Sequence, residues 1–197
     1  MSGSTPGLTT VELDLPDAES TRGLGRALAG VLRAGDLVIL TGDLGAGKTT
    51  LTQGLGAALG VRGQVASPTF IVAREHPPLP QPDGTLGPAL VHVDAYRLGS
   101  LAELDALDLD STLDEAVTVV EWGRGLAEAL TDDRLEIDLV RPRGAGDGAR
   151  SVAGADGVAV LDLGEDPEAG VRRATVRAVG PRWAGVDLAG LLGARPN

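Results

Sequence analysis

Residues 36–49 read DLVILTGDLGAGKT, so that a short apolar run leads directly into a glycine-rich turn. The run 36–41 is bounded by Gly35 and Gly42, which is typical of a buried central strand. Residues 48–59 have the composition of a helix, and Gly60 follows as a candidate C-cap. The stretch therefore predicts a strand, a tight turn and a helix in immediate succession.

The turn fits the phosphate-loop pattern G-x-x-x-x-G-K-[ST] and lies between a strand and a helix, as that chemistry requires. Its glycines let backbone N–H groups and the helix N-terminus face a polyphosphate. Lys48 is expected to reach the β- and γ-phosphates, and Thr49 to offer a hydroxyl to Mg²⁺. We predict a site for ATP and Mg²⁺ built from Gly42, Asp43, Leu44, Gly45, Ala46, Gly47, Lys48, Thr49 and Thr50.

Lys48 is also the only lysine among 17 basic residues, the rest being arginine. An ammonium group is a compact point charge, whereas guanidinium is a broad planar fork. A single lysine in such a chain therefore indicates a position where arginine does not fit.

The remaining chain alternates apolar strands with helical segments, which predicts an α/β fold. We expect a P-loop NTPase fold, with a mixed central sheet flanked by helices and antiparallel strands at the margin, as one domain over residues 1–197. Residues 1–7, 77–88 and 141–157 are expected to be flexible loops or termini. The expected strands are 9–13, 36–41, a segment ending near Glu75, 89–94, 117–121, 134–140, 158–163 and 173–179; the expected helices are 17–32, 48–59, short pieces within 100–114, a short helix after Trp122, and 186–192.

Two acids stand at the ends of apolar strands, Asp94 after LVHV and Glu121 after VTVV. In α/β sheets the carboxyl ends of strands face the ligand crevice. Phosphoryl transfer needs acids there to hold a metal and to orient water, so Asp94, Glu121 and Lys48 are the candidate catalytic residues. Ordinary solvated strand-end carboxylates are the alternative.

Three further features allow two interpretations each. The segment Ser67-Pro-Thr-Phe70 is either a switch loop whose hydroxyls sense the γ-phosphate or a plain turn. His92 is more typical of a packed core histidine than of a catalyst. Trp122 either closes over the site or anchors the following helix.

Composition narrows the function classes. The chain has 28 acidic residues and a net charge of −11, without a basic stripe, so any RNA contact is expected to be made by a partner. It has no cysteine and no apolar stretch near the roughly 18 residues that span a bilayer, which predicts a cytoplasmic protein that does not enter membranes. GTPases recognise guanine with an Asn-Lys-x-Asp signature. The only lysine of this chain is Lys48 and its only asparagine is Asn197, so the signature is absent and guanine specificity is disfavoured.

The combination of Gly42–Thr50, Ser67–Phe70, His92-Val-Asp-Ala-Tyr-Arg97 and Glu121-Trp122 resembles the TsaE (YjeE) family of bacterial ATPases over roughly residues 11–140. The resemblance implies a role in making N6-threonylcarbamoyladenosine beside the tRNA anticodon. In such systems a TsaD–TsaB complex transfers the group, and the TsaE-like ATPase docks on that complex and supports its turnover. Contact with tRNA would then be indirect.

The same resemblance implies roles for individual residues. Thr49 and Glu121 would be the Mg²⁺ ligands, and Asp94 would position metal-bound water or link hydrolysis to docking. Thr21, Trp122 and one arginine of the pair Arg172 and Arg173, assigned here to Arg173, would contact the nucleotide. The acidic segment 100–114 is a candidate docking surface, with a solvated helix face as the alternative.

Two other functions remain open at this stage. A P-loop small-molecule kinase would consume ATP only with its acceptor, although the strand and helix that precede the loop here disfavour it. A regulatory module that senses nucleotide without hydrolysing it is the second alternative.

Overall fold

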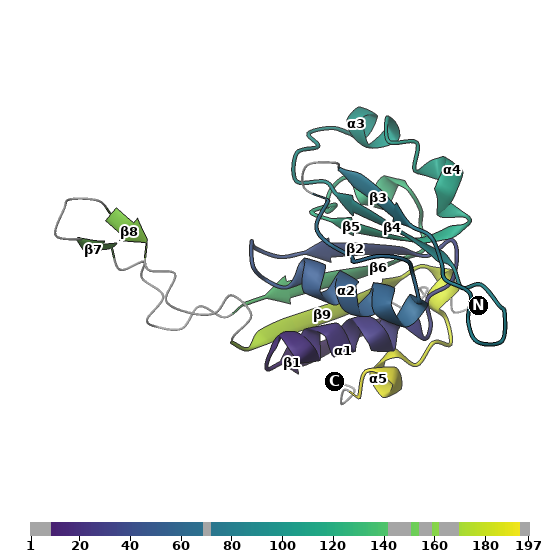
Figure 1. Ribbon diagram of the computed structural model, residues 1–197, viewed down its shortest axis with the longest axis horizontal. Helices are drawn as coiled ribbons and strands as arrows, with labels where there is room; N and C mark the ends of the chain where they lie inside the picture. The colour runs from purple at the N-terminus through teal and green to yellow at the C-terminus, as the bar shows by residue number, and fades with distance from the viewer. Residues whose placement is uncertain (1–8, 69–71, 142–150, 154–158, 162–169, 194–197) are drawn as a thin grey trace, which may run out of the picture.

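The computed structural model describes residues 9–68, 72–141, 151–153, 159–161 and 170–193, and its main feature is a seven-stranded mixed sheet. The strands follow the order β1-β9-β6-β2-β5-β4-β3 (Figure 1). Their bounds are Thr9–Leu15 for β1, Leu37–Thr41 for β2, Ala73–His76 for β3, Ala89–Asp94 for β4, Ala116–Glu121 for β5, Arg134–Val140 for β6 and Arg172–Val179 for β9. The predicted α/β fold with a mixed sheet is confirmed.

The centre of the sheet is parallel and both margins are antiparallel. Strand β2 pairs in parallel with β5 and β6, and β4 pairs in parallel with β5. Strand β9 runs antiparallel to β1 and β6, and β3 runs antiparallel to β4. Because β2, β4 and β5 point the same way, their carboxyl ends share one edge of the sheet, where ligands bind in open α/β folds.

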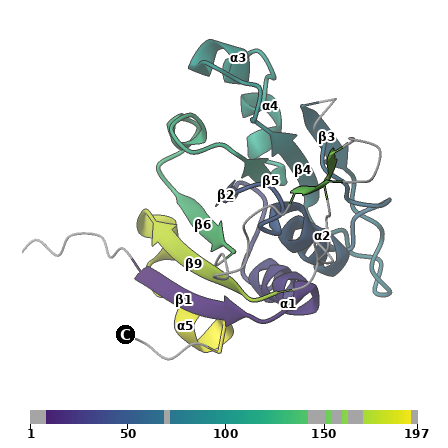
Figure 2. The same ribbon diagram turned by 90° about the vertical axis from the view of Figure 1, so that its left-hand side faces the viewer.

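Two helices, α1 (Ala18–Ala29) and α2 (Lys48–Leu59), lie side by side on one face of the sheet (Figures 1 and 2). The Asp17 side chain caps α1 by accepting the Ser20 N–H at 2.7 Å, so the helix begins one residue later than the expected 17–32, and it ends at Ala29. Gly60 ends α2 with a φ of +69°, as predicted. None of the helices in the described part of the chain is long and apolar enough to cross a membrane.

The other face of the parallel strands is covered by short elements, and a last pair lies near β1. Helices α3 (Leu101–Asp105) and α4 (Asp110–Leu113) and the 3₁₀ turn η1 (Ala127–Ala129) follow β4 and β5. The 3₁₀ turn η2 (Pro181–Trp183) and helix α5 (Leu188–Leu191) follow β9. Two apolar cores result: one between the sheet and α1 and α2, and one under α3, α4 and η1.

Helices α1 and α2 touch through glycine. A Cβ atom on Gly25 would meet the Leu51 carbonyl, and one on Gly54 would meet the Arg22 backbone. The contact is therefore backbone against backbone, and it holds α1 beside the start of α2. As a result, Thr21 of α1 lies next to Gly47 of the glycine-rich loop, with its Cγ2 atom 3.3 Å from where a Cβ of residue 47 would be.

Three expectations need correction. Residues 159–161 form a strand, β8, but it pairs with β7 (Ser151–Ala153) in a separate two-stranded sheet and is not part of the margin, because β1 fills the place beside β9. Strand β7 also lies inside a segment expected to be loop. The final helix is shorter than the predicted 186–192, because Asp187 caps it by accepting the Gly190 N–H and the helix begins at Leu188.

The predicted loops lie partly outside the described residues. Residues 1–7 and most of 141–157 are not described. Residues 77–88 form an irregular, mostly exposed loop that is tied by bridges from Val61 to Pro78 and from Pro80 to Leu86.

Candidate nucleotide-binding site

The glycine-rich loop runs from the carboxyl end of β2 into α2. Gly42, Gly45 and Gly47 have φ values of +151°, +78° and +106°, which other residues rarely adopt. Gly42 also has no room for a Cβ atom, which would meet the Leu139 carbonyl of β6. Helix α2 begins at Lys48 without a side-chain cap, so its first N–H groups face the loop. The backbone is thus shaped for an anion.

Lys48 is 5% exposed and its ammonium group is held inside the loop. The Nζ atom donates to the carbonyls of Gly42 at 2.8 Å and Asp43 at 3.1 Å. It also lies 3.8 Å from the centre of the Trp122 ring. Burial lowers the pKa of Lys48 below 10.5, while the charges of Glu121, Asp94 and Asp43 act in the opposite direction.

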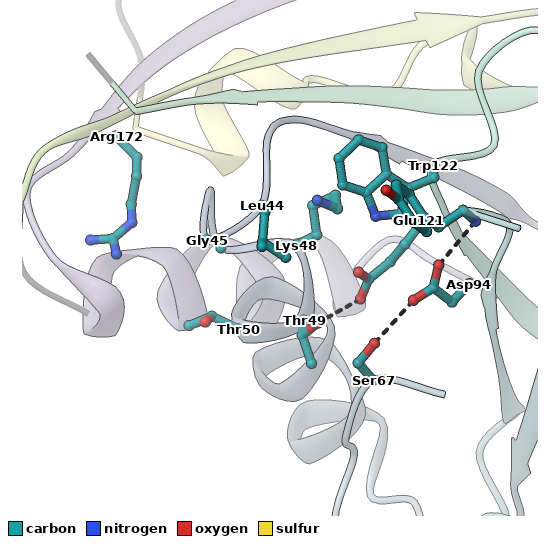
Figure 3. A pocket seen from close by; sticks show the side chains of 12 residues that line it. Leu44, Gly45, Lys48, Thr49, Thr50, Ser67, Asp94, Glu121, Trp122 and Arg172 are labelled. Carbon is teal, nitrogen blue, oxygen red and sulfur yellow. Dashed lines mark hydrogen bonds between the residues drawn. The ribbon is translucent and has the colours of Figure 1, made fainter. Parts of the chain in front are cut away.

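Glu121 lies at the carboxyl end of β5 and is 3% exposed. Its Oε1 atom accepts a hydrogen bond from the Thr49 hydroxyl at 2.9 Å (Figure 3). The same oxygen lies 2.8 Å from Nε2 of the fully buried His92. The predicted pair of metal ligands is therefore in direct contact, and the histidine interpreted as core packing contacts it as well.

Asp94, at the carboxyl end of β4, lies beside Glu121 in the strand register and is 6% exposed. Its Oδ2 atom accepts from the Ser67 hydroxyl at 3.1 Å, and its Oδ1 atom accepts the Tyr96 N–H at 3.0 Å. Ser67 therefore contacts the site, which agrees with the switch-loop interpretation. Thr69 and Phe70 of the same motif lie outside the described residues.

Trp122 follows Glu121 with a φ of +62°, a left-handed conformation that is uncommon for residues other than glycine. The backbone N–H of Trp122 donates to the Leu40 carbonyl at 3.0 Å, so the strained turn is anchored to β2. The turn places the indole over Lys48 and edge-on to Tyr96, with ring centres 5.3 Å apart. Trp122 thus lies over the site, the first of its two interpretations.

These groups line a cavity of about 620 Å³, a size typical of small-molecule sites. Figure 3 shows Lys48, Thr49, Glu121 and Asp94 grouped at one end, with Thr50 and Arg172 toward the other. The lining residues are Leu44, Gly45, Gly47, Lys48, Thr49, Thr50, Ser67, Asp94, Tyr96, Glu121, Trp122 and Arg172. Asp43 and Ala46 shape the loop behind this surface, and Thr21 supports Gly47 from α1.

The arginine that faces the cavity is Arg172, whereas the sequence-based assignment was Arg173. Arg172 is 2% exposed and lines the cavity, with its Nε atom 3.7 Å from where a Cβ of Gly47 would be. Arg173 points to the opposite face of β9 and pairs with Asp14 at 3.2 Å. The alternation of Ala174, Val176 and Ala178 already assigned even-numbered residues of this strand to the buried face.

His92 is buried in the core, as interpreted, but sequence reasoning did not anticipate that it contacts Glu121 or that Tyr96 lines the cavity. Strand β4 alternates, so His92 shares a face with Asp94, and this periodicity was an available signal. Tyr96 gave no signal of its own, because its place depends on how the chain turns after Asp94.

The phosphate loop lies between the parallel strand β2 and a helix, and acids stand at the ends of the adjacent strand β5 and of β4, the next strand in the sheet. This is the arrangement of P-loop NTPases. The comparisons with known proteins agree with this class. The chain belongs to the TsaE family, because the family model described as "Threonylcarbamoyl adenosine biosynthesis protein TsaE" matches residues 15–150.

Curated relatives and a solved structure extend this similarity. A Streptomyces coelicolor protein named "tRNA threonylcarbamoyladenosine biosynthesis protein TsaE" is 51% identical over 87% of this chain and 99% of its own length. The protein of the same name from Bacillus subtilis is 38% identical over 68% of this chain and 78% of its own length. The crystal structure of Bacillus subtilis YdiB superposes with a TM-score of 0.60 and 28% identity, covering 96% of this chain and 97% of that one.

Proposed function

We propose that this protein is a Mg²⁺-dependent ATPase that supports the synthesis of N6-threonylcarbamoyladenosine on tRNA, together with a TsaD–TsaB transferase complex. The observation that carries the ATPase part is the 2.9 Å contact between Thr49 and Glu121, next to the buried Lys48. The pathway part rests on the family and on the names of the relatives.

The loop residues fit the triphosphate of ATP. The loop glycines have positive φ values that other residues rarely adopt, and α2 contributes uncapped N–H groups at the end of the loop. Lys48 now donates to two loop carbonyls, and a phosphate oxygen would be a stronger, charged acceptor for the same ammonium group. The two hydrogen bonds to the Gly42 and Asp43 carbonyls thus keep the Lys48 ammonium group beside the proposed phosphate site.

The oxygen atoms of Thr49 and Glu121 fit Mg²⁺, which prefers oxygen ligands and keeps several waters. Thr49 offers a hydroxyl and Glu121 a carboxylate, and both side chains line the cavity. When bound there, Mg²⁺ would neutralise charge on the β- and γ-phosphates. Within the described residues no cluster of three histidine, cysteine or acidic side chains forms a dedicated metal cage.

Asp94 is the group we assign to orienting the attacking water. Ser67 and the Tyr96 N–H fix its two oxygens, yet a carboxylate oxygen has a further lone pair to accept from water. Its register position beside Glu121, our proposed Mg²⁺ ligand, supports this assignment. Asp94 would therefore hold water and accept its proton as hydrolysis proceeds.

The partner assignment follows from charge as well as from the family. A net charge of −11 opposes direct tRNA binding, so the contact with tRNA would pass through the transferase complex. The acidic residues that the structure places around α3 and α4 are our candidate docking surface for that complex, and cytoplasm is the compartment we propose.

The test is ATP hydrolysis by the pure protein with Mg²⁺, alone and with a cognate TsaD–TsaB complex. We expect a slow rate alone and stimulation by the complex. Glu121→Gln or Glu121→Ala should lower the rate by about 100- to 1,000-fold, the usual cost of losing one preorganised electrostatic group. Glu136→Gln, which changes a strand glutamate outside the cavity, is the matched control and should keep the rate.

Two other outcomes would replace the proposal. ATP consumption that requires an added metabolite, and not the complex, and that transfers the phosphoryl group to this metabolite would identify a small-molecule kinase. Tight ATP binding with no turnover under any of these conditions would identify a nucleotide-sensing module.

A further inference from the structure

The buried contact between His92 and Glu121 is not explained by the chemistry described so far. His92 has no exposed surface, and its Nε2 atom lies 2.8 Å from Glu121 Oε1. A histidine that only filled the core would not need an acidic partner, and apolar residues would serve the same packing. The question is what this contact does for Glu121.

The partner decides which ring nitrogen carries hydrogen. A carboxylate oxygen only accepts, so Nε2 must donate to it. Nδ1 has no hydrogen-bond partner in the part of the chain that the structure describes. A lone pair is less costly to bury there than an N–H group, so the tautomer with hydrogen on Nε2 fits the surroundings.

The strand register fixes the direction of this donor. His92 lies opposite Val119 and Asp94 lies opposite Glu121, so His92 and Glu121 are diagonal neighbours on the face of the sheet that α2 covers. Both strands are central, with paired strands on each side. The imidazole therefore approaches Glu121 along the face under α2, and His92 is not among the residues that line the cavity.

Thr49 and His92 reach the same oxygen of Glu121, Oε1. As a metal ligand, Thr49 would present its hydroxyl oxygen to the cation, and the hydrogen bond from His92 would be a second contact that keeps the Glu121 carboxylate in place. Outer-shell donors of this kind typically change metal affinity or activity by about 10- to 100-fold when removed.

We propose that His92 is a positioning residue: its Nε2–H group fixes the Glu121 carboxylate so that Thr49 and Glu121 form a preorganised site for a divalent cation. This inference rests on the proposed function, because it assigns a role toward the Mg²⁺ of that site. It predicts that His92 affects metal binding and not the binding of nucleotide alone.

The test uses three substitutions in the full chain at one fixed pH. Gln places an amide N–H near the position of Nε2 and keeps the donor. Asn keeps a buried amide but is too short to reach Glu121, and Leu removes the donor while keeping volume. Mn²⁺ serves as the probe, its binding to the ADP-loaded protein measured by electron paramagnetic resonance, and ADP affinity is measured separately in EDTA by calorimetry.

The expected pattern is a loss of about 10- to 100-fold in Mn²⁺ affinity for His92→Leu and His92→Asn, with most of the affinity restored in His92→Gln. The ADP affinity in EDTA should stay within about twofold of wild type. If His92→Leu fails to fold, the comparison of the Asn and Gln variants carries the test, because both bury an amide and differ only in reach.

Three results would overturn the inference: Mn²⁺ affinity unchanged in His92→Leu and His92→Asn, equal loss in the Gln and Asn variants, or a parallel loss of ADP affinity in EDTA. The last would show that His92 supports the loop structure. If the wild-type protein with ADP does not bind Mn²⁺, the proposed Mg²⁺ dependence fails first, a result distinguishable from these three.

Discussion

Strand β2 has a buried charge cluster at each end, and the two clusters differ in what holds them. At the amino end, Asp36 is 3% exposed and accepts from Arg182 through both oxygens, each at 2.9 Å. At the carboxyl end, Lys48 donates to carbonyls, and Glu121 accepts from a hydroxyl and an imidazole.

The difference indicates that the amino-end cluster stabilises the fold, whereas the carboxyl-end cluster belongs to the proposed binding site. Buried charges are stable only when they are paired or well hydrogen-bonded, and the bidentate pair at the amino end meets this condition fully. The same guanidinium also donates to the Val31 carbonyl at 2.8 Å, which ties the segment after β9 to the end of α1. At the carboxyl end the charges are held by carbonyls, a hydroxyl and an imidazole, and this end lines the cavity that we propose for a phosphate and a cation.

The largest expected effect comes from breaking the amino-end cluster. Arg182→Ala should lower the free energy of unfolding by about 3–5 kcal/mol, because it leaves Asp36 buried without its cation. Denaturant unfolding measures this. The matched control is Arg173→Ala, which removes an exposed pair with Asp14 and should cost less than about 1 kcal/mol. Equal costs for the two variants would show that the amino-end pair is not a structural clamp.

The opposite pattern is expected for Lys48→Ala. Affinity for ATP should fall by about 10- to 100-fold, equivalent to the 1.5–3 kcal/mol of a charged hydrogen bond, as measured by calorimetry. Stability at neutral pH should not fall, because burial already disfavours the ammonium form in the folded protein. ATP affinity equal to that of wild type would contradict the assignment of the phosphate loop.

The same substitution has a pH signature. The pKa of Lys48 is lowered from 10.5 by burial, so the unfolded chain binds more protons than the folded one between the folded pKa and 10.5. Wild-type stability should therefore rise relative to Lys48→Ala as the pH increases through that window. Parallel stability curves for the two proteins would mean that burial does not lower this pKa.

A smaller effect, on ADP affinity, is expected to distinguish Arg172 from Arg173, the two neighbouring arginines of β9. Arg172→Ala should weaken ADP binding by about tenfold, the lower end for a charged hydrogen bond, because this side chain lines the cavity. Arg173→Ala should leave ADP affinity unchanged, since Arg173 lies on the other face and pairs with Asp14. Calorimetric titration of both variants decides which arginine the nucleotide meets.

The smallest effect is expected on the solvent-facing side of β6 and β9. Asp138 there contacts Arg124 and Arg177, and although partial burial acts to raise its pKa, these hydrogen bonds lower it overall. Asp138→Asn should cost about 0.5–1 kcal/mol at pH 7, because solvent screens such pairs, and less in 1 M salt. The contribution is present above pH 3.8, the ordinary pKa, and is lost as the pH falls through the lower folded pKa. A cost that is independent of salt would point to packing instead.

Local signals predicted the elements around the phosphate loop closely. Helix α2 and strands β4 and β6 have the predicted bounds, because a glycine cap, a short apolar run and strand alternation are properties of neighbouring residues. Prediction was weaker after β6. The partner of a strand is a long-range choice, and nothing within residues 158–163 indicated that they would pair with 151–153 rather than join the main sheet.

By itself, the sequence determined that this protein has a phosphate loop on a strand–helix turn, and that acids stand at the ends of two further strands. Motif spacing and alternation carry this information, since both act over a few residues. Only the tertiary structure decided that the buried face of β9 borders the cavity at Arg172 and that Trp122 covers Lys48. It also decided that Glu121 is held by Thr49 and His92. These contacts join residues far apart in the chain, and they depend on strand order and register, which short-range patterns do not encode.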